Sequence, residues 1–165
     1  MRTHAVIASP VGDLTVVREG PALVGLYFEG HKRRPNETTF GERADESFDD
    51  VRHQLKEYFA GTRHTFDLEL TPEGNAFQRR VWTLLTRIPY GETRSYGDLA
   101  RQLGDISLSQ AVGAANGLNP LSVIVPCHRV VAADGNLRGY AGGLARKRYL
   151  LELEEPDAAS ADRLF

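Results

Sequence analysis

The spacing of apolar residues changes once along this 165-residue chain. In residues 4–28, short β-branched runs alternate with turns rich in glycine and proline, which is typical of antiparallel strands. Beyond residue 75, apolar residues recur every three or four positions, as in helices that bury one face. The turn-like stretch at residues 71–74 separates the two patterns. The sequence therefore predicts an α+β protein, with a sheet segment over residues 1–72 and a mostly helical segment over residues 73–155.

The sheet segment is expected to hold a three-stranded antiparallel sheet and one helix. The strands are predicted at residues 4–8, 14–17 and 23–28, and a helix over residues 46–59, where apolar residues have helical spacing. Residues 66–70 alternate in polarity and predict a final strand.

Two polar stretches are expected to lie at the surface. Residues 29–45 predict a loop, and its basic cluster, Lys32, Arg33 and Arg34, is more typical of a solvated surface than of a binding site. Residues 156–165 form an acidic tail that is expected to fray.

The helical segment contains a predicted helix-turn-helix. A helix over residues 77–88 is followed by a second one, which Ser95 caps together with Asp98 in a capping box. After a tight turn with glycine, Ser107 can cap a third helix. This third helix, around residues 111–115, has small and uncharged side chains, so it can approach a narrow minor groove closely. Close packing inside the protein is the alternative, and composition alone favours it.

Charge and composition narrow the classes of partner. The formal net charge is −2, but residues 73–153 carry 10 Lys and Arg against 6 Asp and Glu, which permits an anionic partner there. The glycine-rich stretch at residues 139–143 lacks the Gly-Lys-Ser/Thr ending of a phosphate loop, which argues against nucleotide binding. We expect no signal peptide, no membrane partner and a cytoplasmic location. A last helix is predicted over residues 144–154.

The chain has a single cysteine, Cys127. One cysteine excludes an internal disulfide and any cysteine-rich zinc site. A lone cysteine is most often an inert buried residue. Here, however, it follows an apolar run that ends at Pro126, and His128 and Arg129 come next. Because cationic neighbours lower the pKa of a thiol, this pattern favours a nucleophile.

A set of short motifs carries a resemblance to a known family. They are Phe-Gln at 77–78, Val-Trp at 81–82, Ile-Pro-Tyr-Gly-Glu-Thr at 88–93, Ser-Tyr-Gly at 95–97, Ala-Val-Gly at 111–113, Asn-Pro at 119–120, Pro-Cys-His-Arg-Val at 126–130 and Gly-Tyr-Ala-Gly-Gly at 139–143. With them the helical segment resembles the O6-alkylguanine-DNA alkyltransferases, or methylated-DNA–protein-cysteine methyltransferases. The sheet segment matches more weakly, mainly through Ser-Pro-Val-Gly at 9–12. The resemblance implies a ribonuclease H-like first segment and a winged-helix-like second one.

The resemblance also implies an activity. Such a protein binds duplex DNA as a monomer from the minor groove and flips out a base. It transfers an alkyl group from O6 of guanine, or O4 of thymine, to its own cysteine. No cofactor takes part, and each molecule acts once. A cytoplasmic, nucleoid-associated location is expected, and cooperative binding along DNA is left open.

The resemblance assigns roles to the residues of the site. Cys127 is the nucleophile, His128 takes its proton through a water, Glu154 orients and charges the imidazole, and Asn119 braces the turn. Four more residues would bind the flipped nucleotide: Tyr96, Val130, Tyr140 and Ala141. Contacts to DNA would come from Gln110, Ala111, Gly113, Ala114 and Arg129.

The chain departs from the family at Gln110, where an arginine that enters the duplex is usual. We expect weaker DNA binding or slower flipping than an arginine would give. Alternatively, Gln110 forms a capping box with Ser107 and folds back onto its own helix. The zinc site of some family members needs cysteines that this chain lacks, so no metal is expected. Two other functions are weighed against alkyl transfer: a lesion-binding protein that recruits repair factors, and a Cys-His hydrolase.

Overall fold

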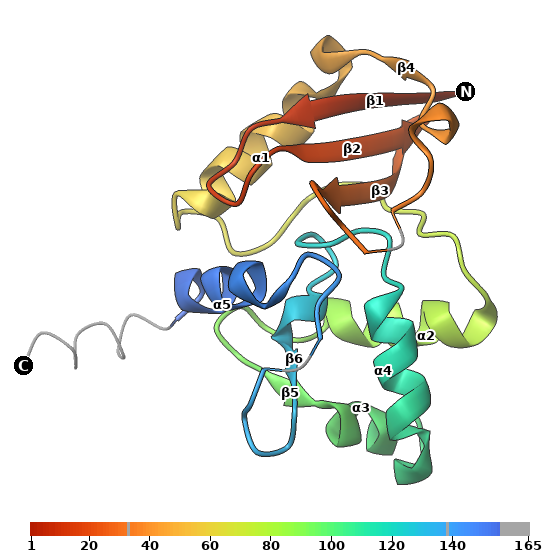
Figure 1. Cartoon of the computed structure of the whole chain (residues 1–165), viewed down its shortest axis with the longest axis vertical. Coiled ribbons are helices and arrows are strands. Elements are labelled where there is room, and N and C mark those ends of the chain that lie inside the picture. Colours follow the sequence, from red (N-terminus) through yellow and green to blue (C-terminus); the bar gives the residue numbers. More distant parts are fainter. Residues whose placement is uncertain (33, 138, 156–165) are drawn as a thin grey trace, which may run out of the picture.

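A four-stranded sheet and one helix form the first segment (Figure 1). The computed structural model describes residues 1–32, 34–137 and 139–155. The three predicted strands are present as β1 (Arg2–Ile7), β2 (Leu14–Glu19) and β3 (Ala22–Phe28), each antiparallel to the next. A fourth strand that was not predicted, β4 (Glu42–Arg43), pairs parallel with β1. Two residues are too few to produce a readable alternation.

The strand predicted at residues 66–70 is wrong. Only an isolated bridge joins Leu70 to Leu23 on β3. The backbone of Asp67 is instead bonded by the side chain of Gln54, whose Nε2 donates to the carbonyl at 2.9 Å while its Oε1 accepts from the N–H at 2.8 Å. A helix side chain thus occupies the backbone groups that a sheet partner would need.

The helix α1 (Asp49–Phe59) covers one face of the sheet, and a 3₁₀ turn (Asp45–Phe48) leads into it (Figure 1). Its buried face includes Val51, Leu55 and Tyr58. The aromatic side chain that α1 buries in the core is therefore Tyr58, whereas Phe59 is only partly buried. This places a tyrosine hydroxyl deep in the protein.

The helical segment begins with α2 (Ala76–Thr86) and continues with α3 (Tyr96–Gln102). The predicted capping box that starts α3 is confirmed, because Ser95 accepts from the Asp98 backbone and Asp98 accepts from the Ser95 backbone.

The predicted start of the third helix is wrong. A 3₁₀ turn (Ile106–Leu108), capped by Asp105, precedes α4 (Ser109–Gly117), and no side chain caps α4. Ser107 therefore forms no capping box with Gln110, whose side chain is exposed. The helix-turn-helix itself is present as α3, this turn and α4.

The end of the described chain folds back along the molecule. Strand β6 (Val130–Val131) pairs parallel with β5 (Arg94–Ser95), and α5 (Leu144–Leu153) returns toward the sheet segment (Figure 1). One hydrophobic core runs through both segments. No helix within the described ranges is long and apolar enough for a membrane crossing. The predicted acidic tail lies outside the described residues.

Candidate active site

Cys127 begins a single 3₁₀ turn (Cys127–Arg129) at the end of a fully buried run. Asn119 holds this run in place: its Nδ2 donates to the Val125 carbonyl at 2.8 Å, and its Oδ1 accepts from the Leu121 N–H at 3.0 Å. Val123 within the run has a φ of 72°, which is strained for a β-branched residue. Asn119 therefore holds the run that leads into the turn at two points, which is the kind of contact that its predicted bracing role needs.

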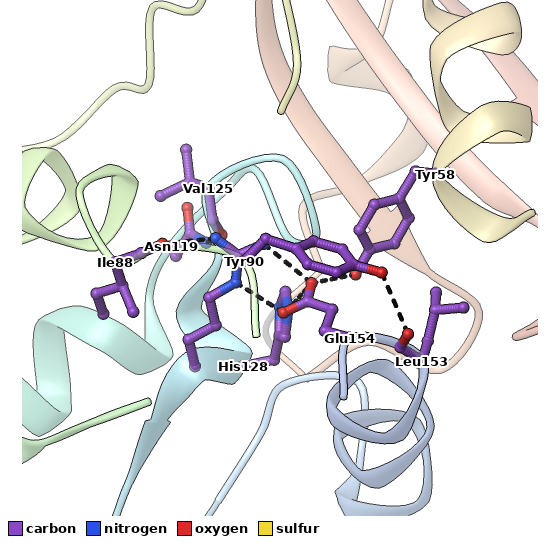
Figure 2. Close-up of polar contacts among 9 residues, drawn as sticks. Tyr58, Ile88, Tyr90, Asn119, Val125, His128, Leu153 and Glu154 are labelled. Carbon is purple, nitrogen blue, oxygen red and sulfur yellow. Dashed lines mark hydrogen bonds and ion pairs between the residues drawn. The ribbon is translucent and has the colours of Figure 1, made fainter. Parts of the chain in front are cut away.

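Behind the cysteine, four donated hydrogen bonds converge on the carboxylate of Glu154. His128 Nε2 lies 2.8 Å from Oε2, and the Tyr58 hydroxyl donates to the same oxygen at 2.5 Å (Figure 2). Arg129 donates from Nε to Oε1 at 2.7 Å and from Nη2 to Oε2 at 3.0 Å. All four side chains are buried. A buried charge with this many donors is compensated rather than isolated.

The ionisation of this network suits His128 to be a base. Burial raises the pKa of Glu154, but His128 and Arg129 outweigh it and lower that pKa to about 2, so the carboxylate is charged. Burial lowers the pKa of His128 despite Glu154, which keeps the imidazole neutral at pH 7. The neutral imidazole of His128 carries its proton on Nε2 and donates it to Glu154 in a hydrogen bond. The other ring nitrogen, Nδ1, therefore has a free lone pair, and it has no hydrogen-bond partner in the described part of the chain.

The thiol of Cys127 is itself buried, and burial raises its pKa. Asn119, Lys147 and Tyr140 act in the opposite direction. Lys147 is fully buried, its Nζ donates to the Val130 carbonyl at 2.7 Å, and burial lowers its pKa to about 8. An ammonium group close to the thiol favours the thiolate form.

Sequence reasoning missed two members of this site, Tyr58 and Lys147. The helical spacing of the sequence places both residues on the buried face of their helices. Tyr58 continues the buried helical spacing of Val51 and Leu55, and Lys147 lies three residues before the buried Leu150. A polar side chain on such a face is a signal of a buried network.

A pocket of roughly 210 Å³ is lined in part by Tyr140, a residue that also acts on the pKa of the Cys127 thiol. Its lining consists of Lys32, Tyr96, Gly113, Asn116, Gly117, Gly139, Tyr140 and Ala141. Three of the four predicted substrate-binding residues thus meet in one cavity. Val130 is not among the lining residues; its side chain is fully buried, and its carbonyl accepts from Lys147 Nζ.

The helix α4 presents a small, uncharged face. Gln110, Ala111 and Ala114 are exposed, and Gly113 lies next to the ring of Tyr96, where a Cβ would be 3.7 Å from the nearest ring carbon. These positions allow a close approach to another molecule, as predicted for a groove-binding helix.

The placement of Arg129 contradicts its prediction as a DNA contact. Its side chain is only 8% exposed, and its Nη1 donates to the Ile88 carbonyl at 2.7 Å. The remaining donors hold Glu154, and the guanidinium lies over the ring of Tyr90. Arg129 therefore belongs to the buried network. Within the described ranges no group of three His, Cys, Asp or Glu side chains is arranged to hold a metal ion.

Comparison with known proteins decides the family. Residues 3–72 match the sequence model of the 6-O-methylguanine DNA methyltransferase ribonuclease-like domain, and residues 76–156 match that of the DNA-binding domain. The chain belongs to the 6-O-methylguanine DNA methyltransferase family. The resemblance inferred from the Pro-Cys-His-Arg motif and its flanking motifs is confirmed.

Members of the family match over nearly the whole chain. A methylated-DNA–protein-cysteine methyltransferase of Mycolicibacterium paratuberculosis is 45% identical over 165 residues, which cover 100% of this chain and 99% of that protein. Another from Methanosarcina acetivorans is 43% identical over 92% of this chain and 97% of its own length. The structure of Mycobacterium tuberculosis OGT in complex with DNA is 47% identical, with a TM-score of 0.88 over 92% of each chain. The α+β fold class is confirmed by these matches.

Proposed function

We propose that this protein repairs DNA by direct reversal and transfers a methyl or larger alkyl group from O6 of guanine to Cys127. The thiolate attacks the alkyl carbon, so a sulfur–carbon bond forms while the O6–carbon bond breaks. The guanine leaves with the bonding electrons and takes up a proton. The observation that carries this proposal is the neutral His128, which Glu154 orients and which directly follows the chain's only cysteine. The pocket lined by Tyr140, which also acts on the pKa of that cysteine, supports it. The names of its relatives support the same activity.

The proton of the thiol would pass to His128. Nδ1 is the free ring nitrogen, and a bridging water is the simplest link between it and the sulfur. Once protonated, the imidazolium lies 2.8 Å from the charged Glu154, which stabilises it. Lys147 adds a second positive charge near the sulfur. Cys127, His128 and Glu154 would thus act as the nucleophile, the base and the orienting carboxylate of a catalytic triad.

The substrate base would have to leave the duplex. The O6 alkyl group is buried in the base stack, so the reaction needs an extruded nucleotide. The pocket lined by Tyr96, Tyr140 and Ala141 would receive it, and the uncharged α4 would approach from the minor groove. The same pocket would admit thymine alkylated at O4.

The two family matches suggest a division of labour. Residues 73–155 would bind DNA and carry the chemistry, while residues 1–72 would support them. We propose that the protein acts as a monomer on the cell's genome in the cytoplasm.

The test is to incubate the protein with a duplex containing O6-methylguanine and to weigh the intact protein. We expect a gain of one methylene group, located on the Cys127 peptide. Cys127→Ser and an undamaged duplex are the matched controls, and neither should give a gain. Tight lesion binding without a change in mass would reject transfer and support the lesion-binding alternative.

A further inference from the structure

A lysine of the sheet segment reaches the pocket that is proposed to receive the base. Lys32 lies in the turn that follows β3, and its backbone N–H donates to the carbonyl of Ala141 at 2.9 Å. Lys32 is one of the residues that line the pocket, together with Tyr96 and Tyr140. A residue that is distant in sequence thus stands at the same opening as the predicted substrate contacts.

The turn that carries Lys32 is held firmly. The Phe28 N–H donates to His31 Nδ1 at 3.2 Å, and Arg34 Nη1 donates to the Phe28 carbonyl at 3.0 Å. The ring of Phe28 packs against that of Tyr140, with 5.8 Å between centroids. The position of Lys32 relative to the pocket is therefore fixed by the fold.

The charge of Lys32 is unused in the described part of the chain. Its exposed ammonium group has no hydrogen bond or ion pair there, whereas the nearby Arg34 is bonded to Thr15 and Glu37. Among the described residues that line the pocket, Lys32 is the one with a charged side chain. The adjacent helix, Ser109–Gly117, carries no charged side chain at all. Within the described ranges, Lys32 therefore offers an unpaired positive charge to a polyanionic ligand at this opening.

We propose that Lys32 binds a backbone phosphate of the nucleotide whose base occupies the pocket. This inference rests on the proposed function. An extruded base keeps its flanking phosphates at the mouth of the pocket, and a lysine is a compact charge on a flexible stem, which suits such a contact. Lys32 also supplies a positive charge to an interface in which Gln110 provides none. The contact forms only when a nucleotide is extruded, so it favours damaged DNA over undamaged DNA.

Salt dependence of binding tests the contact, with Cys127→Ser as the background so that no transfer occurs. For a duplex with O6-methylguanine, Lys32→Ala should reduce the slope of log K against log salt by about 0.9, the value for one phosphate. The slope for the undamaged duplex should not change. Lys32→Arg should restore the slope for the damaged duplex. Lys56→Ala is the matched control, since Lys56 is exposed on α1 and does not line the pocket.

Transfer from the free base separates phosphate binding from damage to the site. With the cysteine intact, Lys32→Ala should slow transfer from duplex DNA at subsaturating concentration. It should leave transfer from free O6-methylguanine, which has no phosphate, at the wild-type rate. Equal salt slopes for Lys32→Ala and wild type on the damaged duplex would overturn the inference. An equal decrease of the slope on damaged and undamaged DNA would also overturn it, as would a slower transfer from the free base. If the wild-type protein gains no methylene from the duplex, the proposed function fails and the inference fails with it.

Discussion

The hydroxyl of Tyr58 donates a 2.5 Å hydrogen bond to Glu154 Oε2, although the two residues are 96 positions apart (Figure 2). Tyr58 belongs to the helix of the sheet segment, and Glu154 follows the last helix of the chain. The same oxygen lies 2.8 Å from His128. The first segment therefore takes part in positioning the proposed base, beyond supporting the second segment.

Tyr58→Phe tests this positioning role. The ring contacts with Phe59 and Phe66 remain, but a buried donor to a charged carboxylate is lost. The free energy of unfolding should fall by about 1.5–3 kcal/mol, measured by denaturant titration. If about 1 kcal/mol of that loss appears in the transition state, transfer to Cys127 slows roughly fivefold at pH 7.

The pH profile distinguishes positioning from simple destabilisation. Without the Tyr58 donor, the pKa of Glu154 should rise from about 2, and the acid side of the transfer profile should move to higher pH. Tyr149→Phe makes the same change at an exposed position on α5 and should alter neither quantity. A lower stability with an unchanged rate and profile would limit Tyr58 to a structural role.

The parts of this protein that were predictable from its sequence depend on local patterns. The capping box of Ser95 and Asp98 joins residues three apart, and β-branched runs between turns indicate the strands. The adjacency of Cys127 and His128 is likewise written in the chain. Each of these features is decided within a few residues.

The features that sequence reasoning missed depend on long-range pairing. The two-residue strand β4 forms by pairing with the edge of β1, a contact between segments far apart in the sequence. Arg129 follows two catalytic candidates, yet whether its side chain points outward or into the network is decided by Glu154, 25 residues later. Lys32 is exposed, as the surface prediction for its stretch requires, but only the hydrogen bond from its backbone N–H to the Ala141 carbonyl brings it to the pocket.

Gln110→Arg should strengthen DNA binding. Gln110 is exposed at the start of α4, where no side-chain cap engages it, so an arginine there is free to contact DNA. The slope of log K against log salt should steepen by up to about 0.9, and transfer at low DNA concentration should become faster. Gln102→Arg adds the same charge at an exposed position of α3 and serves as the control. If the Gln110→Arg variant binds DNA no more tightly and transfers the alkyl group no faster than wild type, the hypothesis that Gln110 limits DNA binding is wrong.

Gly142→Ala should disturb the loop that carries Tyr140. A Cβ at Gly142 would lie 2.4 Å from the ring of Phe28, whereas a Cβ at Gly139 would meet nothing within 4 Å. Because Phe28 is fully buried, the loop must move, and the free energy of unfolding should fall by about 1–3 kcal/mol. Gly139→Ala, in the same loop, should change it by less than about 1 kcal/mol. Equal thermal melting curves for the two variants would show that the ring of Phe28 moves to accommodate the new Cβ while the loop stays in place.

Stability should depend on pH through His31, which anchors the turn that holds Lys32. Burial, with help from Arg34 and Arg146, lowers the pKa of His31 to about 4, and its Nδ1 accepts from the Phe28 N–H. The unfolded chain binds this proton below about pH 6.5, so stability is complete above that pH and falls as the pH drops toward 4. A glutamine at this position offers an oxygen to the same N–H but does not titrate. Between pH 7 and pH 4, wild type should therefore lose about 1–3 kcal/mol more unfolding free energy than His31→Gln. His53→Gln, at an exposed position, should behave as wild type, and parallel curves for wild type and His31→Gln would show that His31 does not couple protonation to folding.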